Sequence, residues 1–153
     1  EETFDVLESG WFGIFAVAVL GPILEEMLFR GAITRELLKH YQPRQAILFS
    51  GLIFGLFHIN PAQVLPAMLI GFVLAWLYWR TKSIIPGILI HIINNSLSCY
   101  LSVAHPEAES IFDITNGKAP VAFCILIALA VGYICVMKLK AVEVIKSEDP
   151  ALS

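Results

Sequence analysis

An apolar run of membrane-span length, Trp11 to Leu24, leads directly into three charged side chains, Glu25, Glu26 and Arg30. A charged side chain at bilayer depth is costly, and such residues usually face the interior of a helix bundle. The sequence therefore predicts a polar site that other helices enclose. Any function of the chain is expected to begin at this site.

The composition places the chain in a membrane. Hydrophobic residues make up 58% of the 153 residues and charged residues only 15%, which is too apolar for a soluble domain of this size. A span needs about 20 mostly apolar residues. We predict an all-α, polytopic transmembrane helix bundle of about five spans, with a kink or break of the first helix at Gly21-Pro22. The spans are expected near residues 10–29, 45–60, 62–79, 84–102 and 119–137.

The positions of charged residues predict the topology. With the spans numbered in order, most basic residues fall on one side of the membrane and most acidic residues on the other. The basic side holds Arg35, Lys39, Arg44, Arg80, Lys82, Lys138, Lys140 and Lys146. Because Lys and Arg favour cytoplasmic loops, we expect an integral, multi-pass protein with a cytoplasmic C-terminus. The lipid bilayer is one partner, and no nucleic-acid partner is expected.

The chain is expected to form one domain over residues 1–146, with its polar motifs inside residues 11–101. The tail, residues 147–153, is expected to be disordered. Because the chain opens with Glu1 and not with Met, and carries no signal peptide, we expect it to be a piece of a longer protein.

Polar residues also interrupt two later spans, as Phe54-x-x-x-His58 and His91-x-x-x-Asn95. If the first two spans form a hairpin, Glu25 and His58 lie at nearly equal distances from its turn and return to one level. His91 and Asn95 are four residues apart, so they share one helical face. A carboxylate, two imidazoles and a carboxamide are thus predicted to meet from three helices.

The spacing of the three charged residues in the first helix separates their roles. Glu26 and Arg30 are four residues apart and can form an ion pair. Glu25 is then rotated by about 100° around the helix and is free to face another neighbour.

Several kinds of chemistry fit these groups. Glu25 could take a proton from a water molecule held jointly with His58, while His91 and Asn95 donate hydrogen bonds to a developing oxyanion. Glu25, His58 and His91 could instead hold a divalent metal such as zinc. A third reading is a polar core without catalysis. The residues alone leave these alternatives open.

Other protease classes are disfavoured by what the sequence lacks. It contains no His-Glu-x-x-His motif of a zincin and no Gly-x-Ser-x-Gly motif of a serine hydrolase. The aspartates Asp5, Asp113 and Asp149 fall outside the predicted spans, which excludes an intramembrane aspartyl dyad on this topology.

The polar motifs together resemble those of a known family. The segment from Gly21 to Gly31, GPILEEMLFRG, is followed in order by Phe54-x-x-x-His58 and His91-x-x-x-Asn95. This ordered triple is similar to the motifs of the CPBP family, the CAAX prenyl protease and bacteriocin-processing proteins, also called Abi, which are intramembrane endopeptidases. A single Glu-Glu-x-x-x-Arg would be weak evidence, but three motifs on separate helices are specific. The resemblance covers about residues 11–101.

The resemblance implies a role for each matching residue. Glu25 matches the catalytic base, His58 the residue that shares the water, His91 and Asn95 the oxyanion pair, and Glu26 and Arg30 supporting positions. It also implies a peptide or protein substrate, lipidated in the case of CAAX processing. We favour a metal-free site, with zinc on Glu25, His58 and His91 as the alternative. A second hypothesis is a non-proteolytic membrane scaffold, immunity factor or transporter-associated domain.

Overall fold

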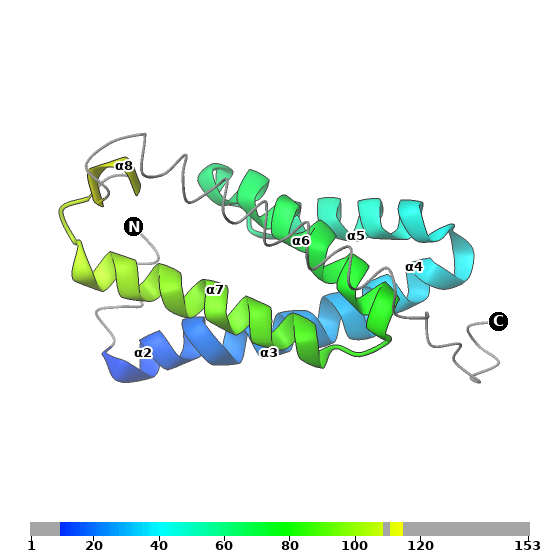
Figure 1. The fold of residues 1–153 in the computed structure, drawn as a ribbon, viewed down its shortest axis with the longest axis horizontal. Helices are drawn as coiled ribbons and strands as arrows, with labels where there is room; N and C mark the ends of the chain where they lie inside the picture. The colour runs from blue at the N-terminus through cyan, green and yellow to red at the C-terminus, as the bar shows by residue number, and fades with distance from the viewer. Residues whose placement is uncertain (1–9, 109–110, 115–153) are drawn as a thin grey trace. The chain divides into compact units, whose positions relative to one another are not determined.

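The computed structural model describes residues 10–108 and 111–114, and every regular element in them is helical (Figure 1). The elements follow one another in this order: α2 (Trp11–Phe15), η1 (Ala16–Leu20), α3 (Gly21–Glu26), η2 (Met27–Thr34), α4 (Arg35–His40), α5 (Pro43–Phe57), α6 (Pro61–Thr81), α7 (Ile85–Ala104) and α8 (Ile111–Ile114). The segments η1 and η2 are π-helical, with wider turns than the α-helical segments around them.

The elements α2 to α4 form one uninterrupted helix, Trp11–His40. The kink predicted at Gly21-Pro22 corresponds to the π-helical segment η1, which ends directly before this pair. The helix does not break there, because Gly21 keeps helical dihedral angles (φ −55°, ψ −57°). Pro22 lies in the first turn of α3, where a missing N–H is best tolerated. The helix continues to His40, past residue 29, where the predicted membrane span ends.

A short turn joins the first helix to α5, where the sequence predicts it. Tyr41 is extended (φ −127°, ψ 155°) and ends α4. Gln42 caps α5, with its N–H donating to Oε1 of Gln45 at 3.2 Å. Pro43 occupies the first turn of α5 and needs no N–H partner there.

The number of spans differs from the prediction. Within the described residues, three helices are long and apolar enough to cross a membrane: Trp11–His40, Gln63–Thr81 and Ile85–Ala104. The predicted second span is helix α5, which is apolar but too short to count with them. The predicted fifth span, residues 119–137, lies outside the described residues, as does the tail 147–153. The segment between the predicted fourth and fifth spans contains the short helix α8.

Helices α5 and α6 lie side by side and pack very closely (Figure 1). Glycines make this approach possible: a Cβ atom on Gly71 would lie 3.1 Å from the Cα of Gly51, and one on Gly55 would lie 2.8 Å from the carbonyl oxygen of Val64. The fully buried Phe54 sits in this contact, beside Gly71. Small residues let helix backbones approach closely in membranes. The pairing of α5 with α6 therefore fixes the position of Phe54.

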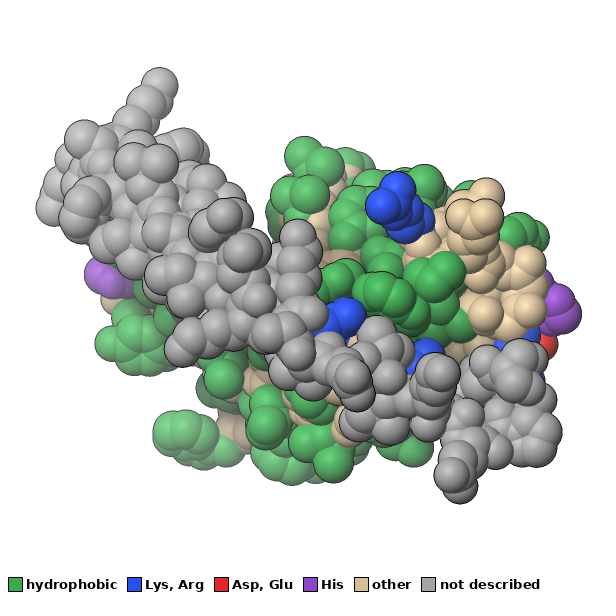
Figure 2. All heavy atoms as spheres, turned by 45° about the vertical axis from the view of Figure 1, so that its right-hand side comes forward, with side chains coloured by type: hydrophobic (Ala, Val, Ile, Leu, Met, Phe, Trp, Pro, Cys, Tyr) green, Lys and Arg blue, Asp and Glu red, His purple; other side chains and the backbone are tan. Residues whose placement is uncertain are grey.

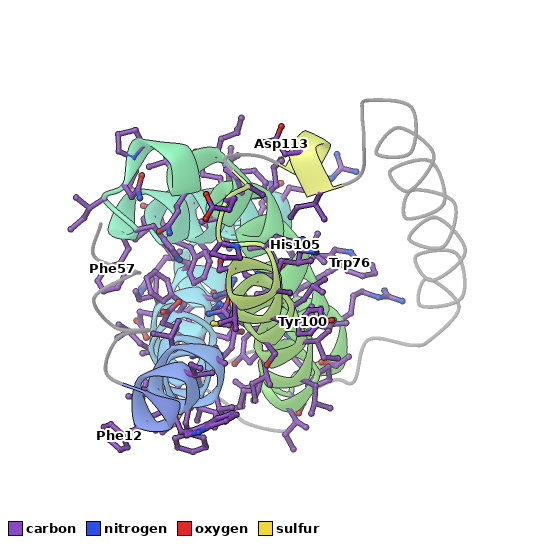
Figure 3. The ribbon with its side chains drawn as sticks, turned by 90° about the vertical axis from the view of Figure 1, so that its left-hand side faces the viewer. Phe12, Phe57, Trp76, Tyr100, His105 and Asp113 are labelled. Atoms are coloured by element: carbon purple, nitrogen blue, oxygen red, sulfur yellow. The ribbon has the colours of Figure 1, made fainter. Side chains whose placement is uncertain are left out.

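The first helix has a buried polar face and an exposed apolar face. Pro22, Glu26, Arg30 and Thr34 follow one another at intervals of four residues, and all are buried. Four apolar residues of the same helix are exposed: Leu20, Leu24, Met27 and Leu28. Hydrophobic side chains also cover much of the surface seen in Figure 2, and Phe12 and Phe57 point away from the helices in Figure 3. A lipid environment favours this arrangement of an apolar outer surface and a polar interior.

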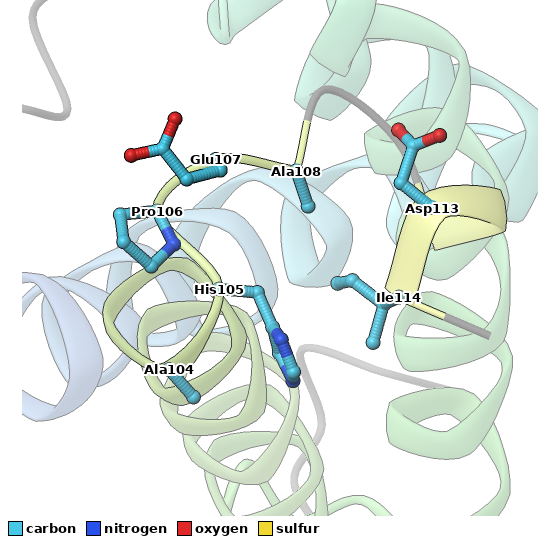
Figure 4. Close-up of a pocket in the computed structure, with 7 residues that line it drawn as sticks. All are labelled: Ala104, His105, Pro106, Glu107, Ala108, Asp113 and Ile114. Carbon is cyan, nitrogen blue, oxygen red and sulfur yellow. The ribbon is translucent and has the colours of Figure 1, made fainter. Parts of the chain in front are cut away.

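The internal contacts divide the chain into two compact units, and the boundary falls within α7, after Ser96. The first unit contains α2 to α6 and the first part of α7, and therefore all the predicted site residues. The second unit has a hollow of about 340 Å³ between residues 104–108 and residues 113 and 114 (Figure 4).

Replacing Gly55 by alanine should destabilise the protein. The new Cβ would contact the backbone of α6 at 2.8 Å, so the two helices would have to separate, at a cost of about 1–3 kcal/mol. Unfolding of the purified protein in mixed micelles measures this change. Gly31→Ala is the matched control, because a Cβ at Gly31 meets nothing within 4 Å. Equal stability of the two variants would contradict the close packing of α5 and α6.

Candidate functional site

A buried ion pair lies at the centre of the first unit. Arg30 Nη1 is 2.9 Å from Glu26 Oε1, and both side chains are fully buried. This confirms the pairing that the four-residue spacing predicts. Arg30 Nη2 also donates to the carbonyl oxygen of Gly71 in α6 at 3.0 Å. The guanidinium carbon lies 4.5 Å from the centre of the Phe54 ring. Arg30 thus connects the first helix to α5 and α6.

His91 brings α7 to the same carboxylate. Its Nδ1 lies 3.2 Å from Glu26 Oε1, and the side chain is almost completely buried. A carboxylate paired with an arginine accepts hydrogen bonds and donates none, so Nδ1 of His91 carries a proton. Its other ring nitrogen, Nε2, lies 3.8 Å from Glu25 Oε2.

His58 approaches Glu25 from the end of α5. Its Nδ1 donates to the carbonyl oxygen of Phe54 at 2.9 Å, since a carbonyl can only accept. In the neutral imidazole this leaves Nε2 as an acceptor. His58 Nε2 lies 4.0 Å from Glu25 Oε2. Both imidazoles therefore direct Nε2 toward one carboxylate oxygen.

Glu25 Oε2 is buried and has no hydrogen-bond partner in the described structure. Its separations from the two imidazole nitrogens, 3.8 Å and 4.0 Å, are too long for direct hydrogen bonds. They suit a water molecule that lies between the polar groups and bonds to them. Such a water could donate one hydrogen to Glu25 Oε2 and the other to Nε2 of neutral His58. Its lone pairs would then be free to attack a carbonyl carbon.

The side chain of Phe54 packs against three components of the site. Its ring centre is 4.8 Å from that of Phe29, 4.9 Å from that of His58 and 5.6 Å from that of His91, with the rings steeply inclined to one another. The interior around Glu25 is therefore bounded by aromatic carbon as well as by polar groups. Such a low-dielectric wall strengthens hydrogen bonds inside the site.

Asn95 does not follow the predicted arrangement with His91. Its Nδ2 donates to the carbonyl oxygen of Val17 in η1 at 3.2 Å, and its Oδ1 accepts from Nδ2 of Asn94 at 3.3 Å. The structure thus brings Arg30, His58 and His91 to the two carboxylates. The amide of Asn95 is bonded instead to the backbone of the first helix.

The site carries more acidic than basic groups. With both imidazoles neutral, two carboxylates and one guanidinium leave a net charge of −1 among Glu25, Glu26 and Arg30. Nε2 of His91 faces Glu25 and could donate a hydrogen bond to an oxyanion only from the doubly protonated imidazole.

The same donor atoms do not form a metal site as they stand. No three His, Cys, Asp or Glu side chains in residues 10–108 and 111–114 are arranged to share an ion. The 3.8 Å and 4.0 Å separations exceed those of about 3.4 Å expected between zinc ligands at tetrahedral angles and bond lengths of about 2.1 Å.

Two glycines support the site and were not singled out by the sequence analysis. Gly71 offers its carbonyl to Arg30. A Cβ atom on Gly87 would lie 2.7 Å from Glu26 Oε2, so the absence of a side chain there makes room for the carboxylate. Gly87 precedes His91 by four residues, so the shared helical face was a signal in the sequence that could have identified it.

Replacing Gly87 by alanine should disturb the Glu26 network. The carboxylate cannot rotate away freely, because Arg30 and His91 both bind it. We expect a loss of about 1–3 kcal/mol in the free energy of unfolding, as for other overpacked interiors. Unfolding in mixed micelles measures it, with Leu89→Ala on the exposed face of α7 as the control. A Gly87→Ala protein as stable as the wild type would contradict the tight fit around Glu26.

Comparisons with known proteins find a matching family model and two curated relatives. The family model described as type II CAAX prenyl endopeptidase Rce1-like matches residues 7–97. YdiL of Bacillus subtilis, provisionally named a membrane peptidase, is 36% identical to this chain over 92 residues. The match covers 60% of this chain and 38% of YdiL. The membrane-embedded CAAX protease MroQ of Staphylococcus aureus is 32% identical over 102 residues, covering 62% of this chain and 41% of MroQ.

The chain spans about two fifths of the length of these curated relatives. No solved structure matches it.

Proposed function

Because the chain belongs to the Rce1-like family of type II CAAX prenyl endopeptidases, we propose that it is a membrane-embedded endopeptidase that hydrolyses a peptide bond with an activated water. It is a multi-pass membrane protein, as its apolar helices and its relatives indicate. The observation that carries the proposal is the buried, unpartnered Oε2 of Glu25, which faces Nε2 of both His58 and His91.

In this proposal Glu25 is the general base. The water oxygen attacks the carbonyl carbon of the scissile peptide while Glu25 Oε2 takes one proton and Nε2 of His58 accepts a hydrogen bond from the other. The oxyanion that forms is stabilised by the N–H at Nε2 of protonated His91. Glu25 then delivers its proton to the leaving amine, which closes the cycle without a covalent enzyme intermediate.

Glu26 and Arg30 support this chemistry without touching the substrate. Glu26 accepts a hydrogen bond from Nδ1 of His91 and so fixes the orientation of the imidazole. Arg30 fixes Glu26 and ties it to Gly71 of α6. The sequence predicts Asn95 as a second oxyanion donor, but its bond with the Val17 carbonyl favours a different contribution.

The basic residues orient the proposed site in the membrane. The turn between α4 and α5 and the connection between α6 and α7 lie at the same end of the first unit (Figure 1), and they carry Lys39, Arg44, Arg80 and Lys82. We assign this end to the cytoplasm, and the predicted fifth span would return the C-terminus to the same side. His91 lies nine residues after Lys82, about 14 Å along the helix, which is within the hydrocarbon layer. The substrate is then a peptide that reaches the site from the cytoplasmic side, as a prenylated C-terminus or a leader peptide would.

Substituting Glu25 by glutamine tests the proposal. The amide keeps the size of the side chain but cannot take a proton, so we expect a loss of activity of about 10²-fold or more. His58→Ala should behave in the same way. The measurement is cleavage of a farnesylated CAAX peptide and of a leader peptide by protein purified in detergent, together with a proteomic comparison of membranes that contain wild type or Glu25→Gln.

Glu36→Gln is the matched control, because Glu36 lies exposed on the same helix and contacts only Lys39 and His40. The helical content and elution volume of each variant show whether it is folded. Unchanged cleavage by folded Glu25→Gln protein would refute the proposed base. A scaffold or immunity role would be favoured by two results together: the wild type cleaves no substrate, and the Glu25→Gln and His58→Ala variants lose folding or partner binding.

Removal of divalent metal should leave the activity intact. The proposed proton transfers use Glu25 and the two imidazoles alone, whose present separations do not suit an ion. We expect unchanged turnover after treatment with EDTA and 1,10-phenanthroline, with metal content measured on the same active sample. Turnover that is lost on chelation and restored by zinc would contradict the metal-free reaction.

A further inference from the structure

The carbonyl of Val17 lacks the usual helical donors. In an α-helix it would accept from the N–H of Gly21, but that N–H donates to the carbonyl of Ala16, five residues back. In the π-helical pattern the donor would be residue 22, which is Pro22 and has no N–H. A backbone carbonyl without a partner inside a membrane protein is costly. This carbonyl therefore needs a donor from outside its own helix.

Asn95 supplies that donor. Its Nδ2 lies 3.2 Å from the Val17 carbonyl oxygen. Since a carbonyl only accepts, the nitrogen and not the oxygen of the amide must face it. The neighbouring Asn94 donates to Asn95 Oδ1 at 3.3 Å, which favours the same orientation. The amide of Asn95 is thus fixed from both ends.

We propose that Asn95 is a positioning residue. It contributes to catalysis by donating a hydrogen bond to the Val17 carbonyl, which has no helical donor because residue 22 is proline. Helix α7 is tied to the first helix twice, once by His91 at Glu26 and once by Asn95 at Val17. The two contacts are one helical turn apart on α7, so together they restrict both the sliding and the rotation of α7. This keeps Nε2 of His91 directed at Glu25.

The proposal rests on the proposed function for its effect on turnover, but the interaction itself can be tested separately. The experiment is a double-mutant cycle with Asn95→Ala, Pro22→Ala and the double variant, made in the full chain. Alanine at position 22 restores an N–H in register with the Val17 carbonyl, so it should make the amide of Asn95 dispensable. Stability is measured by unfolding in mixed micelles, and kcat and KM are measured per folded molecule.

We expect Asn95→Ala alone to raise the unfolding equilibrium constant roughly three- to tenfold, the range for the loss of one interhelical hydrogen bond. It should also lower kcat of the folded protein with little change in KM. In the Pro22→Ala background both losses should largely disappear. Ile93→Ala, on the exposed face of the same helix, should change neither quantity.

Two results would overturn the proposal. An equal loss of kcat from Asn95→Ala in both backgrounds would show that the amide acts directly on the substrate. A stability cycle without coupling between positions 22 and 95 would show that the Val17 carbonyl does not need the amide. Because the stability cycle requires no turnover, it stays decisive even if Glu25→Gln turns out to be active and the proposed function fails.

Discussion

The arrangement of the first unit depends on the buried contact between Glu26 and Arg30. Taking both charges out of water is expensive, and removing one partner of such a pair typically costs about 3–5 kcal/mol because the other is left uncompensated. Here each partner also bonds to another helix: Arg30 to the carbonyl of Gly71 in α6, and Glu26 to the imidazole of His91 in α7. The ion pair is thus a junction of three helices, and Glu25, one residue away, takes its position from it.

This junction requires backbones that approach closely, and glycine provides them. At Gly71 the carbonyl of α6 comes within reach of a guanidinium, and at Gly87 the carboxylate of Glu26 occupies the space of a missing side chain. Phe54 then fills the interior between Arg30 and the two imidazoles. Polar groups form the site, but its dimensions are set by residues with no titratable group.

The sequence predicted which polar residues lie close together better than it predicted their individual contacts. Regular spacing was enough to pair Glu26 with Arg30 and to bring Glu25 and His58 to one level, because both follow from helix dimensions. The contact of His91 with Glu26 and that of Asn95 with Val17 were not predicted, since they depend on how α7 lies against the first helix. The first helix continues to His40, beyond the predicted membrane span, because its basic end remains helical after the apolar run. The fifth span stays a prediction.

The π-helical segment η1 has a consequence for insertions and deletions in this helix. The widened turn holds about one residue more than an α-helical turn. The residues before η1 are therefore rotated about the helix axis by about 100° relative to their positions in a regular α-helix. Deleting a single residue within Ala16–Leu20 would leave Glu25, Glu26 and Arg30 untouched in their own register. It would nevertheless swing the preceding residues, Trp11 and Phe12 among them, onto a different side of the bundle. The extra residue in η1 therefore sets the rotation of the exposed aromatic residues at the start of the helix relative to the polar residues at its middle.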